Sequence, residues 1–188
     1  MVYLDNSATT RPSRAVRDAM THSMEEVYFN PSALYGPAMQ AEKELTAARK
    51  ALADRLGVPA KNVIFTSGGT ESNSLAVMGA AYQMRRFGKR IVSTSVEHPS
   101  IDETLNKLEA EGFEVIKLRV DNFGRVNERE LYAAVNSNTI LITMMLVNNE
   151  TGHILPVRRV FYGAKRKNPQ IITHCDAVQG FLKVPIRI

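Results

Sequence analysis

The hydrophobic positions along the chain follow two kinds of spacing, one typical of strands and the other typical of helices. Short apolar or β-branched runs predict strands near residues 63–66, 90–95, 113–118, 139–147 and 170–174. Between these runs, helical spacing predicts helices near residues 70–86, 99–111, 127–136 and 156–168. Two more helices, near 12–27 and 37–56, precede the first strand. Because strands and helices alternate, we expect an α/β fold: a three-layer domain with a mainly parallel sheet flanked by helices on both faces.

The chain shows no internal repeat, low-complexity tract or linker. We therefore expect the 188 residues to form one large domain. Within it, a helical segment covers about 1–60 and an α/β core covers about 61–188.

Composition narrows the class of protein. The chain is 44% hydrophobic and 23% charged, which is typical of a globular protein with a real core. No apolar run approaches the ~20 residues that span a bilayer, so we expect no membrane insertion. A single cysteine excludes an internal disulfide framework and favours a cytoplasmic location. The densest basic group, residues 84–90, is interpreted as a solvated helix end, and nucleic-acid binding is not favoured.

Polar clusters follow four of the five predicted strands. They occupy residues 67–70, 97–98, 148–152 and 174–180. In open α/β sheets, ligands bind outside the carboxyl ends of the strands. We therefore expect the four clusters to surround one crevice.

The residue types in this crevice match one cofactor. The Gly68–Gly69–Thr70 turn could bind a phosphate through backbone N–H groups and a hydroxyl. His98 offers a flat ring for stacking, and Asp176 offers a carboxylate for a protonated ring nitrogen. A ligand that satisfies these residues has a phosphate, an aromatic ring, a ring nitrogen and a phenolate, which together describe pyridoxal 5′-phosphate (PLP). An acidic partner on its ring nitrogen makes this cofactor an electron sink.

Asn149 and Gln179 could donate hydrogen bonds to the phenolate oxygen or to a substrate carboxylate. A metal is not predicted. The run His174–Cys175–Asp176 alternates between two faces of a strand, and no second cluster has ligand spacing.

Simpler roles are open for several of these residues. The glycine turn could be a plain strand-to-helix connection capped by Ser67 or Thr70, and His98 beside Pro99 could cap a helix. Asp176 could equally be a helix N-cap. Cys175 is interpreted as a buried structural thiol.

Six motifs carry a resemblance to a known family: YLDNSATT, NPSALYGPA, FTSGGTESNSLAV, EHPSI, VNNETG and HCDAVQGFLKVPI. In this order they resemble the N-terminal half of cysteine desulfurases. These enzymes belong to the class V aminotransferase group and have the aspartate-aminotransferase (type I) fold of PLP-dependent transferases.

The resemblance implies roles for individual residues. Gly69 and Thr70 resemble the phosphate-binding positions, and His98 resembles the catalytic histidine that stacks on the ring. Asp176 resembles the partner of the pyridine nitrogen. Gln179 resembles the donor to the phenolic oxygen of the cofactor, and Asn149 resembles a contact to cofactor or substrate. Asn30 resembles a loop residue near the bound amino acid.

The implied reaction converts L-cysteine to L-alanine and passes the sulfur to an enzyme cysteine as a persulfide, for iron-sulfur cluster or thio-cofactor synthesis. The resemblance also implies a homodimer and a sulfur-acceptor or scaffold protein as partners.

The family's Schiff-base lysine, acceptor cysteine and small C-terminal domain have no counterpart in these 188 residues. We therefore expect this chain to bind PLP non-covalently at best and to be inactive by itself. The alternatives are a non-catalytic PLP-binding or dimerisation fragment and another class V enzyme such as a selenocysteine lyase.

Overall fold

The computed structural model describes residues 2–185. The chain divides into two compact units, one ending at Phe65 and the other beginning at Thr66, and each is described by itself. That both belong to one large domain stays a prediction.

The first unit is helical. It contains α1 (Arg14–Glu25), α2 (Gly36–Leu56) and a short 3-10 helix, η1 (Ala60–Asn62). The side chain of Ser13 caps α1 by accepting a hydrogen bond from the backbone N–H of Val16. His22 on α1 lies 3.5 Å from the carboxylate of Glu44 on α2, so the two helices are in polar contact.

The strand predicted at 63–66 is wrong. These residues pair with no other strand in the described part of the chain, and Ile64 and Phe65 are 69% and 44% exposed. The segment is instead tied to α2 by Arg49, which donates to the Val63 carbonyl and lies 4.7 Å over the Phe65 ring. An apolar run can form a strand only where a neighbour supplies the ladder of hydrogen bonds, and this segment has none.

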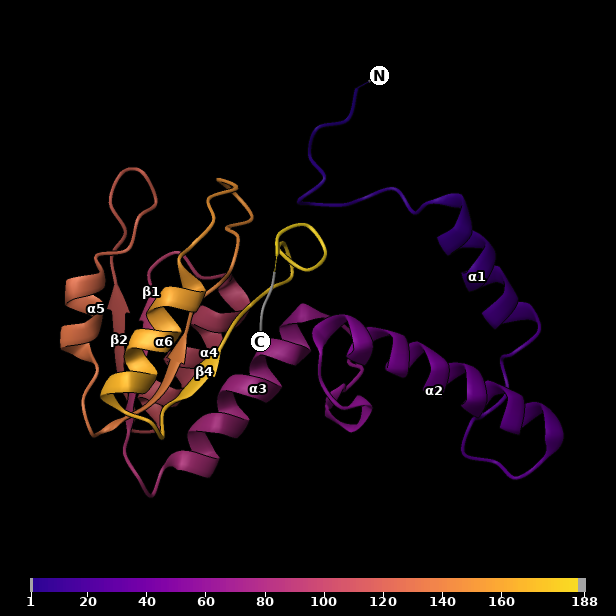
Figure 1. Cartoon of the computed structure of the whole chain (residues 1–188), viewed down its shortest axis with the longest axis horizontal. Helices are drawn as coiled ribbons and strands as arrows, with labels where there is room; N and C mark the ends of the chain where they lie inside the picture. Colours follow the sequence, from indigo (N-terminus) through magenta and orange to yellow (C-terminus); the bar gives the residue numbers. More distant parts are fainter. Residues whose placement is uncertain (1, 186–188) are drawn as a thin grey trace. The chain divides into compact units, whose positions relative to one another are not determined.

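The second unit contains a four-stranded sheet in the order β2-β1-β3-β4 (Figure 1). The strands are β1 (Arg90–Thr94), β2 (Glu114–Leu118), β3 (Thr139–Thr143) and β4 (Ile172–His174). All three pairings are parallel, so the predicted parallel sheet is confirmed. β1 and β3 are central, and nine of their ten residues are buried.

Helices cover both faces of this sheet, which confirms the three-layer α/β fold. They are α3 (Gly69–Met84), α4 (Pro99–Ala110), α5 (Glu128–Ala134) and α6 (Val157–Lys167). On one face, Val77 of α3 and Leu105 of α4 share a core with Ile91 of β1. On the other, Leu131 of α5 and Val160 of α6 share a core with Ile142 of β3. Within residues 2–185, no helix is both long and apolar enough to cross a membrane.

Candidate active site

Asp176 follows β4 at the carboxyl edge of the sheet, and its carboxylate is held from two sides. The side chain is 7% exposed. Its Oδ2 accepts a hydrogen bond from the Asn73 side-chain amide at 2.7 Å, and its Oδ1 accepts one from the Val178 backbone N–H at 3.0 Å. The alternative role as a helix N-cap is wrong, because turns follow Asp176 and no helix begins there.

Asn73 connects Asp176 to the start of α4. The same side-chain amide donates to Ser100 Oγ at 2.9 Å, and Ser100 Oγ lies 2.8 Å from His98 Nδ1. His98 Nδ1 also accepts from the Ser100 backbone N–H at 3.1 Å. A nitrogen that accepts is unprotonated, so these bonds assign the proton of a neutral His98 ring to Nε2.

The structure therefore confirms that His98 caps α4.

The first turn of α3 lies beside the segment that follows Asp176. A Cβ atom added to Gly69 would lie 3.0 Å from Val178 Cγ2, so the backbone here approaches its neighbour closely. No side chain caps α3. The cap expected from Ser67 or Thr70 is therefore wrong, since Ser67 donates both its N–H and its hydroxyl to Glu71 instead, at 2.7 and 2.6 Å. A helix start without a side-chain cap has backbone N–H groups that can bind an anion.

Glu97 links the ends of the two central strands. Its Oε1 accepts from the Thr94 hydroxyl at 2.6 Å, at the end of β1, and from the Met145 backbone N–H at 3.1 Å, just past β3. Its Oε2 is buried without a partner among the described residues. Burial raises the pKa of Glu97 to about 7, and the nearby carboxylates of Asp176 and Asp102 raise it further against the lowering effect of the two hydrogen bonds.

The two residues that precede Asp176 have shifted pKa values. Burial, together with Asp176 and Glu97, raises the pKa of the Cys175 thiol to about 12. Burial lowers the pKa of His174, although Asp176 opposes that shift. Cys175 is half-buried, so its prediction as a buried thiol is corrected to that extent. A thiol with so high a pKa is a poor nucleophile at neutral pH.

Asn149 lies in the turn that follows β3. Asn148 shapes this turn, since its Oδ1 accepts from the Glu150 and Thr151 backbone N–H groups at 3.0 and 2.9 Å. The turn lines a cavity of about 360 Å³ that Glu97 also lines. Asn149 and Glu97 thus border the same cavity.

Gln179 lies in the turn after Asp176, where its Oε1 accepts from Lys183 Nζ at 3.1 Å. Asn30 belongs to the first unit, and its side chain accepts from the Ser32 backbone N–H at 2.9 Å. The functional roles of both residues stay predictions.

Sequence reasoning missed Asn73 and gave Glu97 no role. Asn73 stands three residues after Thr70, which places both on neighbouring positions of one helical face. Glu97 immediately precedes His98 in a loop at the end of a strand. A polar residue three positions after Thr70, and another directly before His98, were the sequence features that could have identified Asn73 and Glu97. Within residues 2–185, no three His, Cys, Asp or Glu side chains are arranged to hold a metal ion.

Known proteins resemble this chain over its whole length. The cysteine desulfurase IscS of Methanosarcina thermophila is 43% identical over 187 residues, which are 100% of this chain and 46% of that protein. The putative cysteine desulfurase IscS 1 of Bacillus subtilis is 35% identical and is matched over 49% of its length. The chain thus spans about half the length of these curated relatives.

Solved structures agree with the sequence relatives. A NifS-like protein superposes with a TM-score of 0.95 at 36% identity, over 100% of this chain and 51% of its own. The protein SspA, solved in complex with cysteine, superposes with a TM-score of 0.91 at 32% identity, over 98% of this chain and 53% of its own. The family model for aminotransferase class V matches residues 2–188. The chain therefore belongs to the aminotransferase class-V family.

Proposed function

We propose that this chain is the cofactor-binding part of a PLP-dependent cysteine desulfurase. The observation that supports this most is the network in which Asn73 joins the buried Asp176 carboxylate to Ser100 and, through it, to His98. One network thus links the carboxylate, the imidazole, α3 and the first turn of α4 at one edge of the sheet.

The residues present fit PLP. The Asp176 carboxylate is buried and already oriented by two donors, so it can hold a proton on a ring nitrogen without reorganising. The start of α3 at Gly69 and Thr70 has no side-chain cap and suits a phosphate. His98 would lie against the ring, and Gln179 would donate to the phenolic oxygen.

PLP, when bound, supplies an electron sink for bond breaking at the substrate's Cα and Cβ. The chain's own contribution is to position and polarise that sink. A buried anion beside a protonated ring nitrogen stabilises the proton strongly because little water screens the pair. Asn149 would then orient the amino acid substrate.

The proposed substrate is L-cysteine, and its sulfur leaves as a persulfide on a cysteine thiol. Cys175 is unsuited to this role because its thiol pKa of about 12 leaves almost no thiolate at neutral pH. It is the sole cysteine of the 188 residues, so the acceptor is a thiol that this sequence does not provide. A sulfur-acceptor or scaffold protein for iron-sulfur cluster synthesis is the corresponding downstream partner.

We also propose that the chain forms a homodimer. Helix α1 has no buried residue, yet Val16, Met20 and Met24 form an apolar stripe with 49%, 53% and 64% of their surfaces exposed. Their spacing of four residues places them on one helical face, and exposed apolar faces of this kind commonly associate. Sedimentation at micromolar concentration should show a dimer, and a monomer under these conditions would contradict the proposal.

The cofactor proposal is tested by titrating the chain with PLP and following the cofactor's absorbance and fluorescence. We expect saturable binding that Asp176→Ala weakens by at least tenfold, about 1.4 kcal/mol. The matched control is Asp54→Ala, which removes an exposed carboxylate on α2. Equal binding by both variants would refute the assigned role of Asp176.

Activity is tested separately by assaying alanine and sulfide from cysteine, with PLP alone as the reference. We expect no turnover above that reference and no PLP fixed to the protein by borohydride. Multiple turnovers abolished by Asp176→Ala would show that a lysine of this chain serves as the base, and Lys183, which contacts Gln179, would be examined first.

A further inference from the structure

The net charge of the chain is concentrated on one helix. The 24 basic and 19 acidic side chains give a net charge of +5 at pH 7. Helix α6 carries five of the basic residues and no acidic one: Arg158, Arg159, Lys165, Arg166 and Lys167. The rest of the chain therefore has equal numbers of basic and acidic side chains, and the excess positive charge belongs to α6.

The helix dipole explains only part of this distribution. Lys165, Arg166 and Lys167 lie in the last turn, where the negative end of the dipole favours cations. Arg158 and Arg159 lie in the first turn, where the positive end disfavours them. Arg159 is paired with Glu128, but Arg158 forms no ion pair in the described part of the chain. An unpaired cation placed against the dipole lowers stability.

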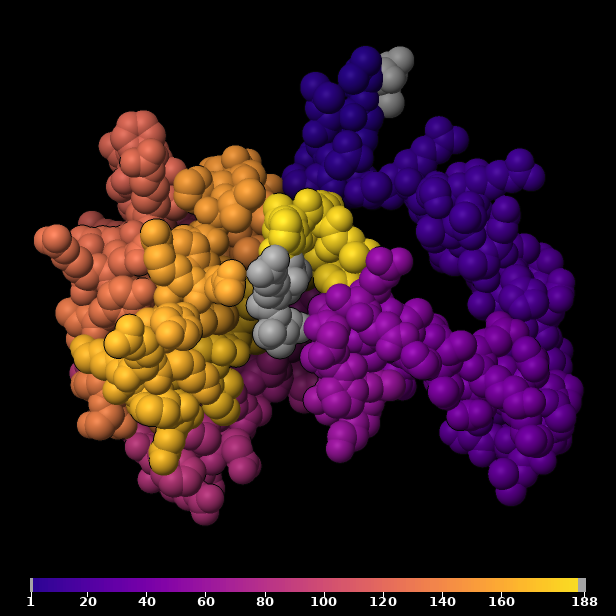
Figure 2. Space-filling model, viewed as in Figure 1, coloured from indigo at the N-terminus to yellow at the C-terminus, as the bar shows by residue number. Residues whose placement is uncertain are grey.

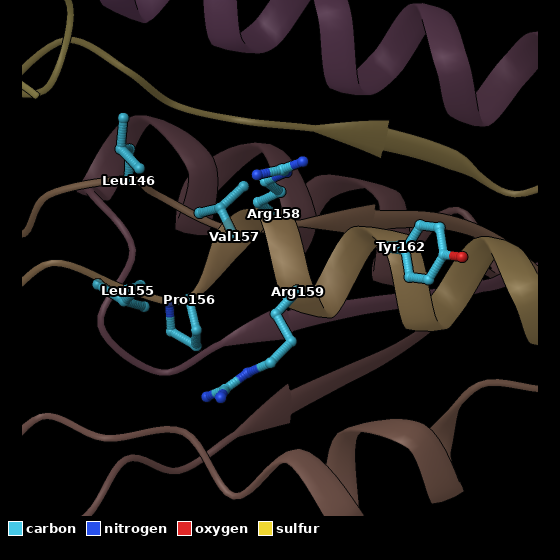
Figure 3. Close-up of a pocket in the computed structure, with 7 residues that line it drawn as sticks. All are labelled: Leu146, Leu155, Pro156, Val157, Arg158, Arg159 and Tyr162. Atoms are coloured by element: carbon cyan, nitrogen blue, oxygen red, sulfur yellow. The ribbon is translucent and has the colours of Figure 1, made fainter. Parts of the chain in front are cut away.

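The first two turns of α6 also border a hollow in the surface. This cavity has a volume of about 630 Å³ and is lined by Leu146, Leu155, Pro156, Val157, Arg158, Arg159 and Tyr162 (Figure 3). Four of these side chains are apolar, and the other three are two arginines and a tyrosine. Tyr162 is 68% exposed. In the space-filling view, α6 lies on the surface of the second unit (Figure 2).

We propose that the basic side chains of α6, together with the cavity beside its first two turns, form a docking site for an acidic protein segment that carries one large apolar side chain. We call this surface the α6 face. The charge of α6 complements acidic residues, which favours fast association and the correct orientation. The cavity receives the apolar side chain, and arginine and tyrosine are the residue types that contribute most to protein interfaces.

A nucleic acid fits this face less well. A phosphate backbone would neutralise the cations, but it has no aliphatic group to fill the apolar part of the cavity. The α6 face does not depend on the proposed PLP chemistry, so either proposal can fail without the other.

The test uses a short peptide of glutamates with a single central tryptophan. The chain contains no tryptophan, so peptide fluorescence reports binding directly. We expect a blue-shifted emission on binding and an affinity that falls as the salt concentration rises. Arg158→Glu, Lys165→Glu and Arg166→Glu together should weaken binding by at least about tenfold. This set leaves the Arg159–Glu128 ion pair intact.

The matched control reverses three exposed cations that do not belong to α6: Arg85→Glu, Arg86→Glu and Lys89→Glu. Both triple variants change the net charge equally, and thermal unfolding verifies that each is folded. Equal weakening by the two variants, or no peptide binding by the unmodified chain, would overturn the proposal.

A second arm separates the cavity from the charge. Tyr162→Ala should weaken binding of the tryptophan peptide. It should leave unchanged the binding of the same peptide with serine at the centre, which is followed through a fluorescein label because that peptide has no tryptophan. A fluorescein-labelled DNA duplex with the same charge as the peptide represents the alternative partner, a nucleic acid. Tighter binding of the duplex than of the tryptophan peptide, insensitive to Tyr162→Ala, would show a nucleic-acid surface and refute the protein partner.

Discussion

The side-chain amide of Asn73 donates to the Asp176 carboxylate at 2.7 Å, across 103 residues of sequence. Both side chains are buried, at 4% and 7% exposure. The contact joins α3, near its start, to the loop after β4, the two elements that are proposed to bind opposite ends of a PLP molecule. The position of the carboxylate is therefore determined by a helix far from it in the chain.

Asn73→Ala should destabilise the chain and also weaken PLP binding. It leaves a buried carboxylate oxygen without its side-chain donor, which costs about 1–3 kcal/mol of unfolding free energy. Urea unfolding and PLP titration measure the two effects. Ser74→Ala, one residue along the same helix, removes a half-buried hydrogen bond to Thr104 and is the control. If Asn73→Ala lowered stability but left PLP affinity unchanged, the orienting role would be refuted.

Glu97→Gln should change how stability depends on pH. Burial and nearby carboxylates raise the pKa of Glu97 from 4.5 to about 7, so the folded state binds more protons than the unfolded state between these values. The unmodified chain therefore loses stability as pH rises from 4.5 to 7, by up to about 3 kcal/mol. Glutamine retains the acceptor oxygen for Thr94 and Met145 and does not titrate.

The variant and the unmodified chain should thus be nearly equally stable at low pH, and the variant should be more stable above neutrality. Thermal unfolding across this pH range is the measurement, with the exposed Glu109→Gln as control. A difference in stability between the variant and the unmodified chain that stayed constant at all pH values would contradict a raised Glu97 pKa.

Cys175 should react slowly with thiol reagents while the chain is folded. With a pKa of about 12, the thiolate fraction at pH 8 is about 10⁻⁴, compared with about one quarter for a free cysteine of pKa ~8.5. Labelling by iodoacetamide should therefore be slower by about three orders of magnitude. The labelling rate should rise to that of a free cysteine when guanidinium unfolds the chain. Native labelling as fast as in the unfolded chain would mean that Cys175 is a competent nucleophile after all.

Replacing glycine by alanine should have opposite effects in two helices. At Gly79, in the middle of α3, an added Cβ meets nothing within 4 Å, so Gly79→Ala should stabilise the chain by about 0.5–1 kcal/mol. At Gly163 in α6, the added Cβ would lie 2.5 Å from the Tyr132 ring. Gly163→Ala should therefore lower stability, because the ring must move from its hydrogen bond to the Arg159 carbonyl. Urea unfolding of both variants decides the sign. Stabilisation by both would show that α5 and α6 pack less closely than described.

The sequence by itself determined the elements and their type. Local hydrophobic period distinguishes helices from strands without reference to the rest of the chain. The six long helices and the four paired strands therefore lie close to their predicted ranges. The polar residues after the strands were equally visible, since a parallel sheet places the ends of its strands at one edge. For the same reason Asp176 and His98 could be selected as candidates before their surroundings were known.

Tertiary structure decided whatever depends on a distant partner. Residues 63–66 have the composition of a strand but find no neighbour to pair with. The strand predicted to reach residue 147 ends at Thr143, although the backbone N–H groups of Met144 and Leu146 still bond to the His174 and Asp176 carbonyls. The roles of Asn73 and Glu97 arise in the same way. A hydrogen bond between residues far apart leaves no periodic trace in the sequence, because its energy depends on where the fold brings the two groups together.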